Sequence, residues 1–293
     1  MAVSAEVLAA AMFAALAGAL LVGFPVAFSV AAVAAVFGVA GVAAGHFQPA
    51  FLLAGTLRVE GFFHNDNLLA IPLFVFMGML LERTGLAADM LHALDELLAA
   101  VRGGMAYTVV LVGASLAAIT GFVSAAVIGL GLIALPAMLR RGYDARLATG
   151  VVAASGTLAQ MLPPSLVLIV LAEQLEVPLM DMFRGALLPS ALLVLLYLLY
   201  IFFAARLWPQ RVPAMPGEVR LRPLAQRSRT ALVAAGFPIG LILLVLASVY
   251  FGVATPTEGG AVGVTGAVAL GLMRRKLDLR RLQQASERPG RPS

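Results

Sequence analysis

Long apolar runs, separated by short charged segments, divide this chain into candidate membrane spans. A helix needs about 20 mainly apolar residues to cross the hydrocarbon core of a bilayer. By that length the predicted full spans are Val7–Val22, Pro25–Ala44, a segment that ends with Leu68–Leu81, Arg146–Leu175, Ala186–Ala205, Thr230–Phe251 and Pro256–Met273. The third run is short, so we expect its span to begin within Phe51–Phe63. The pattern predicts an all-α polytopic membrane protein.

Residues 84–101 carry a different pattern, with apolar side chains on one helical face and acidic ones off it. The apolar positions are Leu86, Met90, Leu94, Leu97 and Leu98, and the acidic ones are Asp89, Asp95 and Glu96. One apolar stripe and one charged face are typical of a helix that lies in the membrane interface. We therefore predict an interfacial helix at residues 84–101.

The uncharged run Met105–Leu139 contains about 35 residues, which is long for one span and would be about 52 Å as a continuous helix. Basic residues stand at both ends, Arg102 before it and Arg140-Arg141 after it, and this places both ends on the same side of the membrane. We predict a re-entrant helical hairpin over residues 104–140, with its tip near Ile119-Thr120-Gly121.

The span Arg146–Leu175 carries a helix-breaking segment at its centre. Pro163 and Pro164 remove two backbone donors, and Gly156 loosens the chain before them. Non-helical backbone at membrane depth requires protein or a wet cavity beside it, and broken helices commonly bind ions and substrates in secondary transporters. We predict that Ser155–Pro163 is non-helical and packs against the hairpin tip.

Composition and charge support a membrane protein and set its orientation. The chain is 61% hydrophobic and 12% charged, with a mean hydropathy of +0.99, whereas soluble domains average about 25% charged residues. With the N-terminus outside, only Arg58 and Arg184 of the 20 Lys and Arg residues lie outside, as the positive-inside rule requires. The basic charge therefore reflects topology, and we predict no nucleic-acid partner. We expect a multi-pass protein of the bacterial inner membrane with a periplasmic N-terminus.

Two short segments of the chain resemble each other, Val22–Ala27 and Val253–Glu258. Each follows one span and opens the next, and the predicted topology places them on opposite sides of the membrane. Such a pair is typical of an inverted-topology repeat. The predicted organisation is a first repeat at 1–205, a cytoplasmic basic linker at 206–229, the first two spans of a second repeat at 230–273, and a basic cytoplasmic tail at 274–293.

Four motifs resemble the large permease subunit of tripartite ATP-independent periplasmic (TRAP) transporters, and they occur in that family's order. They are Asn67–Gly78, Gly131–Asp144, Ala154–Thr157 with Pro163–Ser165, and Thr255–Glu258. The resemblance implies an elevator-type transporter of the ion-transporter superfamily. It also implies sodium-driven uptake of organic acids such as C4-dicarboxylates or sugar acids, a small membrane subunit and a periplasmic substrate-binding protein. Sodium is then the coupling ion, and no organic cofactor is expected.

The C-terminal sequence departs from that family. After Lys276–Leu282 the family continues with a second hairpin and a second broken helix, whereas Ala285–Ser293 matches neither. We therefore expect a permease truncated in its second half. An alternative function is a non-transporting membrane fragment, because an elevator site is built from both repeats, and we expect that this chain alone does not transport.

The candidate site combines small polar residues of the hairpin with residues of the break. Hard cations prefer oxygen ligands, and a half-helix that begins near Pro164 would direct a partial positive charge at an anion. The predicted sodium and substrate ligands are Ser115, Thr120, Gly121, Ser124, Ser155, Gly156, Thr157, Pro163, Pro164 and Ser165. The alternative is that these small residues only allow helices to pack closely.

Other features have simpler explanations than a binding site. Glu258 forms a capping box with Thr255 rather than a buried proton carrier. Residues 64–67 are expected to cap a helix, and the pairs Gly41/Gly45 and Gly259/Gly263 to serve helix packing. An intramembrane serine protease would need a histidine base near Ser155. The three histidines, His46, His64 and His92, lie in loops or in the interfacial helix, so we do not expect an enzyme.

Overall fold

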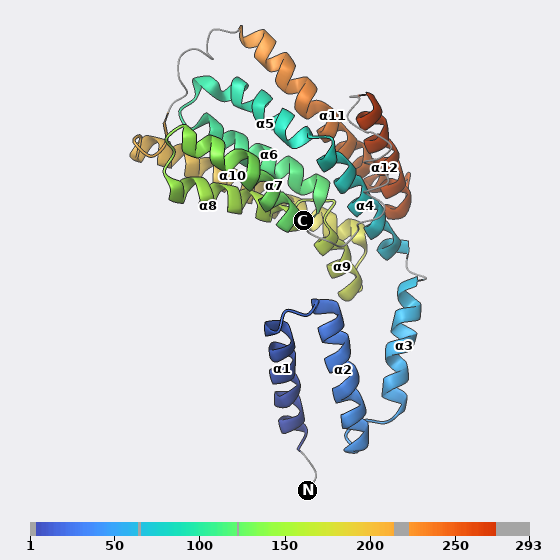
Figure 1. Cartoon of the computed structure of the whole chain (residues 1–293). Coiled ribbons are helices and arrows are strands. Elements are labelled where there is room, and N and C mark those ends of the chain that lie inside the picture. The colour runs from blue at the N-terminus through green and yellow to red at the C-terminus, as the bar shows by residue number, and fades with distance from the viewer. Residues whose placement is uncertain (1–3, 64–65, 122, 214–222, 274–293) are drawn as a thin grey trace. The chain divides into compact units, whose positions relative to one another are not determined.

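The structure, a computed structural model, describes residues 4–63, 66–121, 123–213 and 223–273, which form helices joined by turns. Two compact units are present, Met1–Asn65 and Asp66–Ser293 (Figure 1). Predictions for residues 64–65, for the middle of the linker and for the tail at 274–293 fall outside the described residues.

The first unit contains α1 (Ala5–Leu21), α2 (Val26–Ala43) and α3 (Ala50–Phe63). The predicted break between the first two spans is confirmed, and Gly23 makes the turn there with φ of 88°. The predicted pairing of Gly41 with Gly45 is wrong, because Gly45 lies beyond the end of α2 in a left-handed turn. Gly41 instead gives room for the ring of Phe47.

The predicted third span is divided into two helices. α3 ends at Phe63, and α4 (Asp66–Arg83) begins after the two undescribed residues. The two helices belong to different compact units. α4 is 18 residues long by itself, and because residues 64–65 lie outside the described part of the chain, the start of the span within Phe51–Phe63 stays a prediction.

In the second unit, α4 lies beside α12 (Pro256–Met273), which also packs against α11 (Leu224–Tyr250) (Figure 1). A Cβ atom at Gly260 would lie 2.9 Å from Cβ of Leu73, and one at Gly259 would lie 2.6 Å from Cγ2 of Val249. Gly263 gives room for Met77. The predicted packing role of Gly259 and Gly263 is confirmed, because these glycines allow α12 to approach both neighbours.

The first turn of α12 is closed by the predicted capping box. The amide of Thr255 donates to Oε2 of Glu258 at 2.7 Å, and the amide of Glu258 donates to Oγ1 of Thr255 at 3.2 Å. Both side chains thus satisfy amides that have no partner within the helix. The carboxylate of Glu258 is a cap, as predicted.

The segment predicted to lie in the membrane interface forms α5 (Leu86–Leu97), which a short 3-10 turn extends to Ala100. It is bent by 60° from α4. Leu86 and Met90 are buried as predicted, but the prediction that Asp95 lies off the buried face is wrong. Its side chain is only 6% exposed because it pairs with Arg141.

The hairpin consists of α6 (Gly104–Thr120) and α7 (Val123–Arg140), which pack against each other. The broken span follows as α8 (Ala145–Thr157), a 3-10 turn at Leu158–Gln160 and α9 (Leu166–Gln174). The turn residue Gly121 has φ of 62°. Both predicted departures from a simple span, the hairpin and the broken helix, are confirmed.

Two predicted boundaries are wrong by several residues. α10 (Leu179–Leu207) begins before Ala186, and α11 begins within the predicted linker. In each case the helix continues past the charged residues that delimited the apolar run, namely Asp181 and Arg184 in α10 and Arg227 and Arg229 in α11.

Four described helices are long and apolar enough by themselves to cross a membrane, at Val26–Ala43, Val123–Arg140, Leu179–Leu207 and Ala225–Tyr250, and a fifth span results if the bent α4–α5 pair is counted. One of the four is α7, an arm of the hairpin. Length and composition therefore do not separate a span from a hairpin arm, and the count of seven spans stays a prediction.

Candidate functional site at the hairpin and the broken helix

The C-terminal end of α8 packs closely on both arms of the hairpin. On the α6 side, a Cβ atom at Gly113 would lie 3.2 Å from the carbonyl carbon of Ser155. On the α7 side, a Cβ atom at Gly156 would lie 2.9 Å from both the Cα and the amide nitrogen of Val127. These separations are too short for side chains, so glycine at both positions lets the three helices meet at backbone distance.

The break begins later than predicted. α8 continues through Ser155 and Gly156 to Thr157, a 3-10 turn follows, and the non-helical part is residues 161–165. The prediction that residues 155–157 are non-helical is therefore wrong. The helix is ended by the prolines, which cannot donate amide hydrogens, whereas Gly156 is required for close packing and remains helical.

Two buried serines hold the backbone of the break. Ser165 Oγ donates to the carbonyl of Gln160 at 2.9 Å. Ser190 Oγ, on α10, lies 2.8 Å from the carbonyl of Met161 and 2.6 Å from that of Ala186. Both residues are fully buried. They replace amide donors that the break lacks, so its carbonyls are held in place without a continuous helix.

Sequence analysis missed Ser190. In the sequence, Ser190 stands out as a single hydroxyl residue, next to Pro189, within the otherwise apolar stretch Ala186–Leu196. The hydroxyl reaches a carbonyl 29 positions earlier in the chain, and only the packing of α10 on the break reveals that contact.

Three of the predicted hydroxyl ligands donate to carbonyls of their own helices. Ser115 donates to Leu111 at 2.9 Å, Ser155 to Val151 at 2.6 Å and Thr157 to Ala154 at 2.8 Å. A hydroxyl that donates its hydrogen in this way still has oxygen lone pairs for a cation. Ser155 is buried and Thr157 half-buried, so both hydroxyls are shielded from bulk water.

The remaining predicted residues are distributed unevenly around the break. Pro163, Pro164 and Ser165 are buried within it, whereas Ser124 is exposed on α7. The side chain of Thr120 lies outside the described residues. The structure thus gathers the residues of α8 and the break, and it leaves Ser124 apart from them on the surface.

The hairpin tip reaches the break at the start of α9. A Cβ atom at Gly121 would lie 3.4 Å from the amide nitrogen of Leu166 and 3.3 Å from its Cγ. The predicted packing of the hairpin on the segment before Pro163 is found for its two arms, where Ala117 and Ala126 cluster with Leu158 and Ala159, whereas Gly121 at the tip packs on the first residue of α9. The first amides of a helix carry a partial positive charge, so the tip covers the polar end of α9.

Removing the Ser190 hydroxyl should weaken the break. We expect Ser190→Ala to lower the free energy of unfolding by about 1–3 kcal/mol, because the carbonyl of Met161 loses the donor supplied by the fully buried Ser190. Thermal unfolding of the purified chain in detergent measures this. The control is Ser248→Ala on α11, whose hydroxyl donates only to Val245, three residues earlier in the same helix, at 2.8 Å. Equal losses in the two variants would contradict a special role for Ser190.

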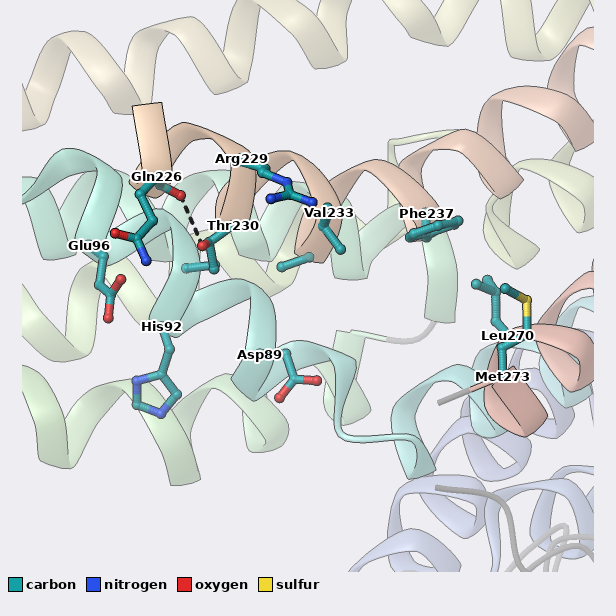
Figure 2. A pocket seen from close by; sticks show the side chains of 12 residues that line it. Asp89, His92, Glu96, Gln226, Arg229, Thr230, Val233, Phe237, Leu270 and Met273 are labelled. Carbon is teal, nitrogen blue, oxygen red and sulfur yellow. Dashed lines mark hydrogen bonds between the residues drawn. The ribbon is translucent and has the colours of Figure 1, made fainter. Parts of the chain in front are cut away.

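A large cavity lies away from this site. It measures about 880 Å³ and is lined by residues of α5, α11 and α12. Figure 2 shows Asp89, His92 and Glu96 of α5 on one side and residues of α11, among them Gln226 and Thr230, on the other. None of the predicted site residues lines this cavity. The cavity and the polar break are therefore two separate candidate locations for a binding site. The break is the better candidate site, because non-helical backbone within an apolar span occurs in membrane proteins where it lies against protein or a wet cavity.

Comparison with known proteins identifies the family. The family model described as the DctM component of the tripartite ATP-independent periplasmic transporter matches residues 11–291. The C4-dicarboxylate TRAP transporter large permease protein DctM of Pseudomonas aeruginosa is 34% identical over 196 residues, 67% of this chain and 44% of the relative.

Two further relatives are also TRAP transporter permease proteins. The isethionate TRAP transporter permease protein DctMQ of Oleidesulfovibrio alaskensis is 31% identical over 70% of this chain and 31% of its own length. The DctM protein of Vibrio cholerae is 28% identical over 84% of this chain and 51% of its own length. The matched regions thus span about half or less of these relatives. The chain belongs to the DctM family of TRAP transporter large permeases, and its long apolar helices are those of a multi-pass membrane protein.

Proposed function

We propose that this chain contributes the ion-binding part of a sodium-coupled importer of organic acids. The observation that carries the proposal is the non-helical break at residues 161–165, of which 163–165 are buried and which Ser190 of α10 holds by a hydrogen bond to Met161. Polar backbone of this kind is expected in a membrane protein where an ion or a substrate binds.

The proposed sodium ligands are oxygens at the junction of α8 with the break. In a continuous helix the carbonyl of Ala159 would accept a hydrogen bond from residue 163, which is proline and has no amide hydrogen. That carbonyl and the hydroxyl oxygens of Ser155 and Thr157 are the hard oxygen donors that suit an alkali cation. Several of the small residues nearby, Gly113 and Gly156 above all, serve packing.

The proposed substrate is a small organic acid. α9 begins at Leu166 with its positive end at the break, and helix N-termini bind carboxylates without a basic side chain. Two relatives are named for anions, C4-dicarboxylates and isethionate, which fits an anion site. We further propose a small membrane subunit and a periplasmic binding protein as partners.

The proposed orientation places the N-terminus in the periplasm of a bacterial inner membrane and the start of α11 in the cytoplasm. Ser228 is exposed and lies between Arg227 and Arg229, and the chain has no native cysteine. We expect Ser228→Cys in intact cells to resist an impermeant thiol reagent and to react after the membrane is permeabilised. Rapid labelling in intact cells would reverse the orientation.

Sodium coupling is tested at Thr157. In a full-length permease that carries this segment, reconstituted with its small subunit and binding protein, we expect Thr157→Val to raise the sodium concentration that half-activates uptake by about tenfold, the equivalent of ~1.4 kcal/mol. Thr149→Val is the matched control, because the exposed hydroxyl of Thr149 donates to a carbonyl of the same helix at 2.8 Å. Unchanged sodium activation in Thr157→Val would exclude this ligand.

A further inference from the structure

The base of the hairpin is fixed to α5 by a buried ion pair that the proposed transport site does not include. Arg141, directly after α7, donates from its two terminal nitrogens to the two carboxylate oxygens of Asp95, at 2.7 Å and 2.6 Å. The carboxylate is 6% exposed and the guanidinium 29%. This fork of two parallel hydrogen bonds fixes the orientation of both groups as well as their distance.

The carboxylate of the pair is nearly closed to water, whereas the guanidinium is partly exposed. The adjoining cavity measures about 10 Å³, about the least volume that holds one water molecule. The hydrogen bond to Asp95 raises the pKa of Arg141, so its charge persists. A buried carboxylate that loses such a partner is left with an uncompensated charge, so the contact favours one arrangement of α5 and α7 strongly over others.

The other arm of the hairpin is held at the same place. Tyr143, two residues after Arg141, is buried against the first amides of α6 at Met105 and Ala106, and burial raises the pKa of Tyr143 to about 12. The backbone amide of Asp144 donates to the carbonyl of Arg211 at 3.2 Å, in the segment after α10. The ends of α6 and α7 opposite the tip are therefore gathered around the Asp95–Arg141 pair.

The next residue of α5 makes a separate contact that does not involve the hairpin. Arg227 of α11 is 8% exposed, and its NH1 donates to the backbone carbonyl of Glu96 at 3.2 Å. It attaches α5 to α11. Asp95 and Glu96 thus connect neighbouring points of one helix to two different partners, which provides a control for the role of either contact.

We propose that Asp95 is a positioning residue of the transport site. Its ion pair with Arg141 fixes the base of the hairpin so that the tip, one helix length of about 25 Å away, rests on the start of α9 at Gly121 and Leu166. The inference rests on the proposed function, because the tip has a transport role only if the break binds an ion or a substrate. Loss of the pair should free the tip while the helices themselves persist.

The test uses one cysteine under the tip. Leu166 is 9% exposed and contacts Gly121, so Leu166→Cys in the cysteine-free chain reports on tip opening through its rate of reaction with a small methanethiosulfonate. We expect Asp95→Asn and Arg141→Gln each to raise that rate by at least about tenfold, as for a local opening that has lost ~1.4 kcal/mol of closing free energy. The double variant should be no faster than either single variant, because both remove one interaction.

Arg227→Gln is the matched control, because this buried arginine donates to the carbonyl of the next residue of α5, Glu96. We expect it to lower thermal stability while the labelling rate at Leu166→Cys stays within about twofold of the parent. If Asp95→Asn folds poorly, Arg141→Lys keeps the charge and loses the fork, and an intermediate rate is expected. A parental rate in the folded pair variants, or equal acceleration in Arg227→Gln, would overturn the proposal.

The same probe separates this proposal from the proposed function. Sodium that slows labelling in the parent, with no effect of Asp95→Asn, would contradict only the positioning role. Acceleration by Asp95→Asn, with no effect of sodium in the parent, would support the positioning role and contradict sodium binding at the break.

Discussion

Replacement of Gly156 by alanine is expected to cost about 1–3 kcal/mol of stability, the usual effect of adding atoms to a fully packed interior. The added Cβ would lie 2.9 Å from the Cα and the amide nitrogen of Val127. Those are backbone atoms, which cannot turn aside as a side chain can. α7 would have to move away from α8, and the hairpin would then no longer be aligned with the break.

The control for Gly156 lies on the same helix. A Cβ atom at Gly150 would meet no atom within 4 Å, and alanine is a better helix former than glycine by about 1 kcal/mol. We therefore expect Gly150→Ala to leave the stability of the purified chain unchanged or raised, whereas Gly156→Ala lowers it. Thermal unfolding in detergent measures both. Equal effects would mean that α8 and α7 are not in backbone contact.

Replacement of Gly121 by valine is expected to displace the hairpin tip. Gly121 has φ of 62°, a conformation that costs L-residues about 1–2 kcal/mol and that β-branched residues rarely adopt. The side chain would also enter the space next to Leu166, where overpacking adds about 1–3 kcal/mol. Both effects act at the contact that closes the polar end of α9.

Gly252→Val separates these two effects. Gly252, after α11, has φ of 70°, and a Cβ atom there would meet no atom within 4 Å. Both variants should carry the backbone strain, but only Gly121→Val should accelerate the labelling of Leu166→Cys. If Gly252→Val accelerates labelling equally, general destabilisation explains the result, and the packing of the tip on α9 is not its cause.

Much of the helical plan could be predicted from the sequence, because apolar length, prolines and paired basic flanks are local signals. The hairpin, the broken helix and the capping box at Thr255 follow from such signals and are confirmed. The predicted ends of the helices are less accurate. α10 and α11 continue past charged residues. A long charged side chain can belong to a helix near a membrane surface, because its charged group can still reach water.

The features that sequence analysis missed depend on tertiary contacts. Asp95 belongs to an acidic cluster that would face water on an isolated helix, and its burial depends on Arg141, 46 positions later. Ser190 has a role only because α10 packs on the break. The sequence alone predicts that Gly156 loosens the helix, because glycine disfavours helices, whereas the structure requires glycine inside α8 because the backbone of Val127 lies next to it. A single sequence carries no direct record of such contacts.

Sodium protection of Leu166→Cys tests the central claim most directly. The purified chain is labelled in sodium chloride and in choline chloride at equal ionic strength, and potassium chloride controls for the presence of a metal cation. Because an ion between α8 and the break should hold the tip closed, the account predicts slower labelling in sodium than in choline or potassium, with a graded dependence on sodium concentration. Identical rates in all three salts, with the chain folded, would contradict a sodium site at this break.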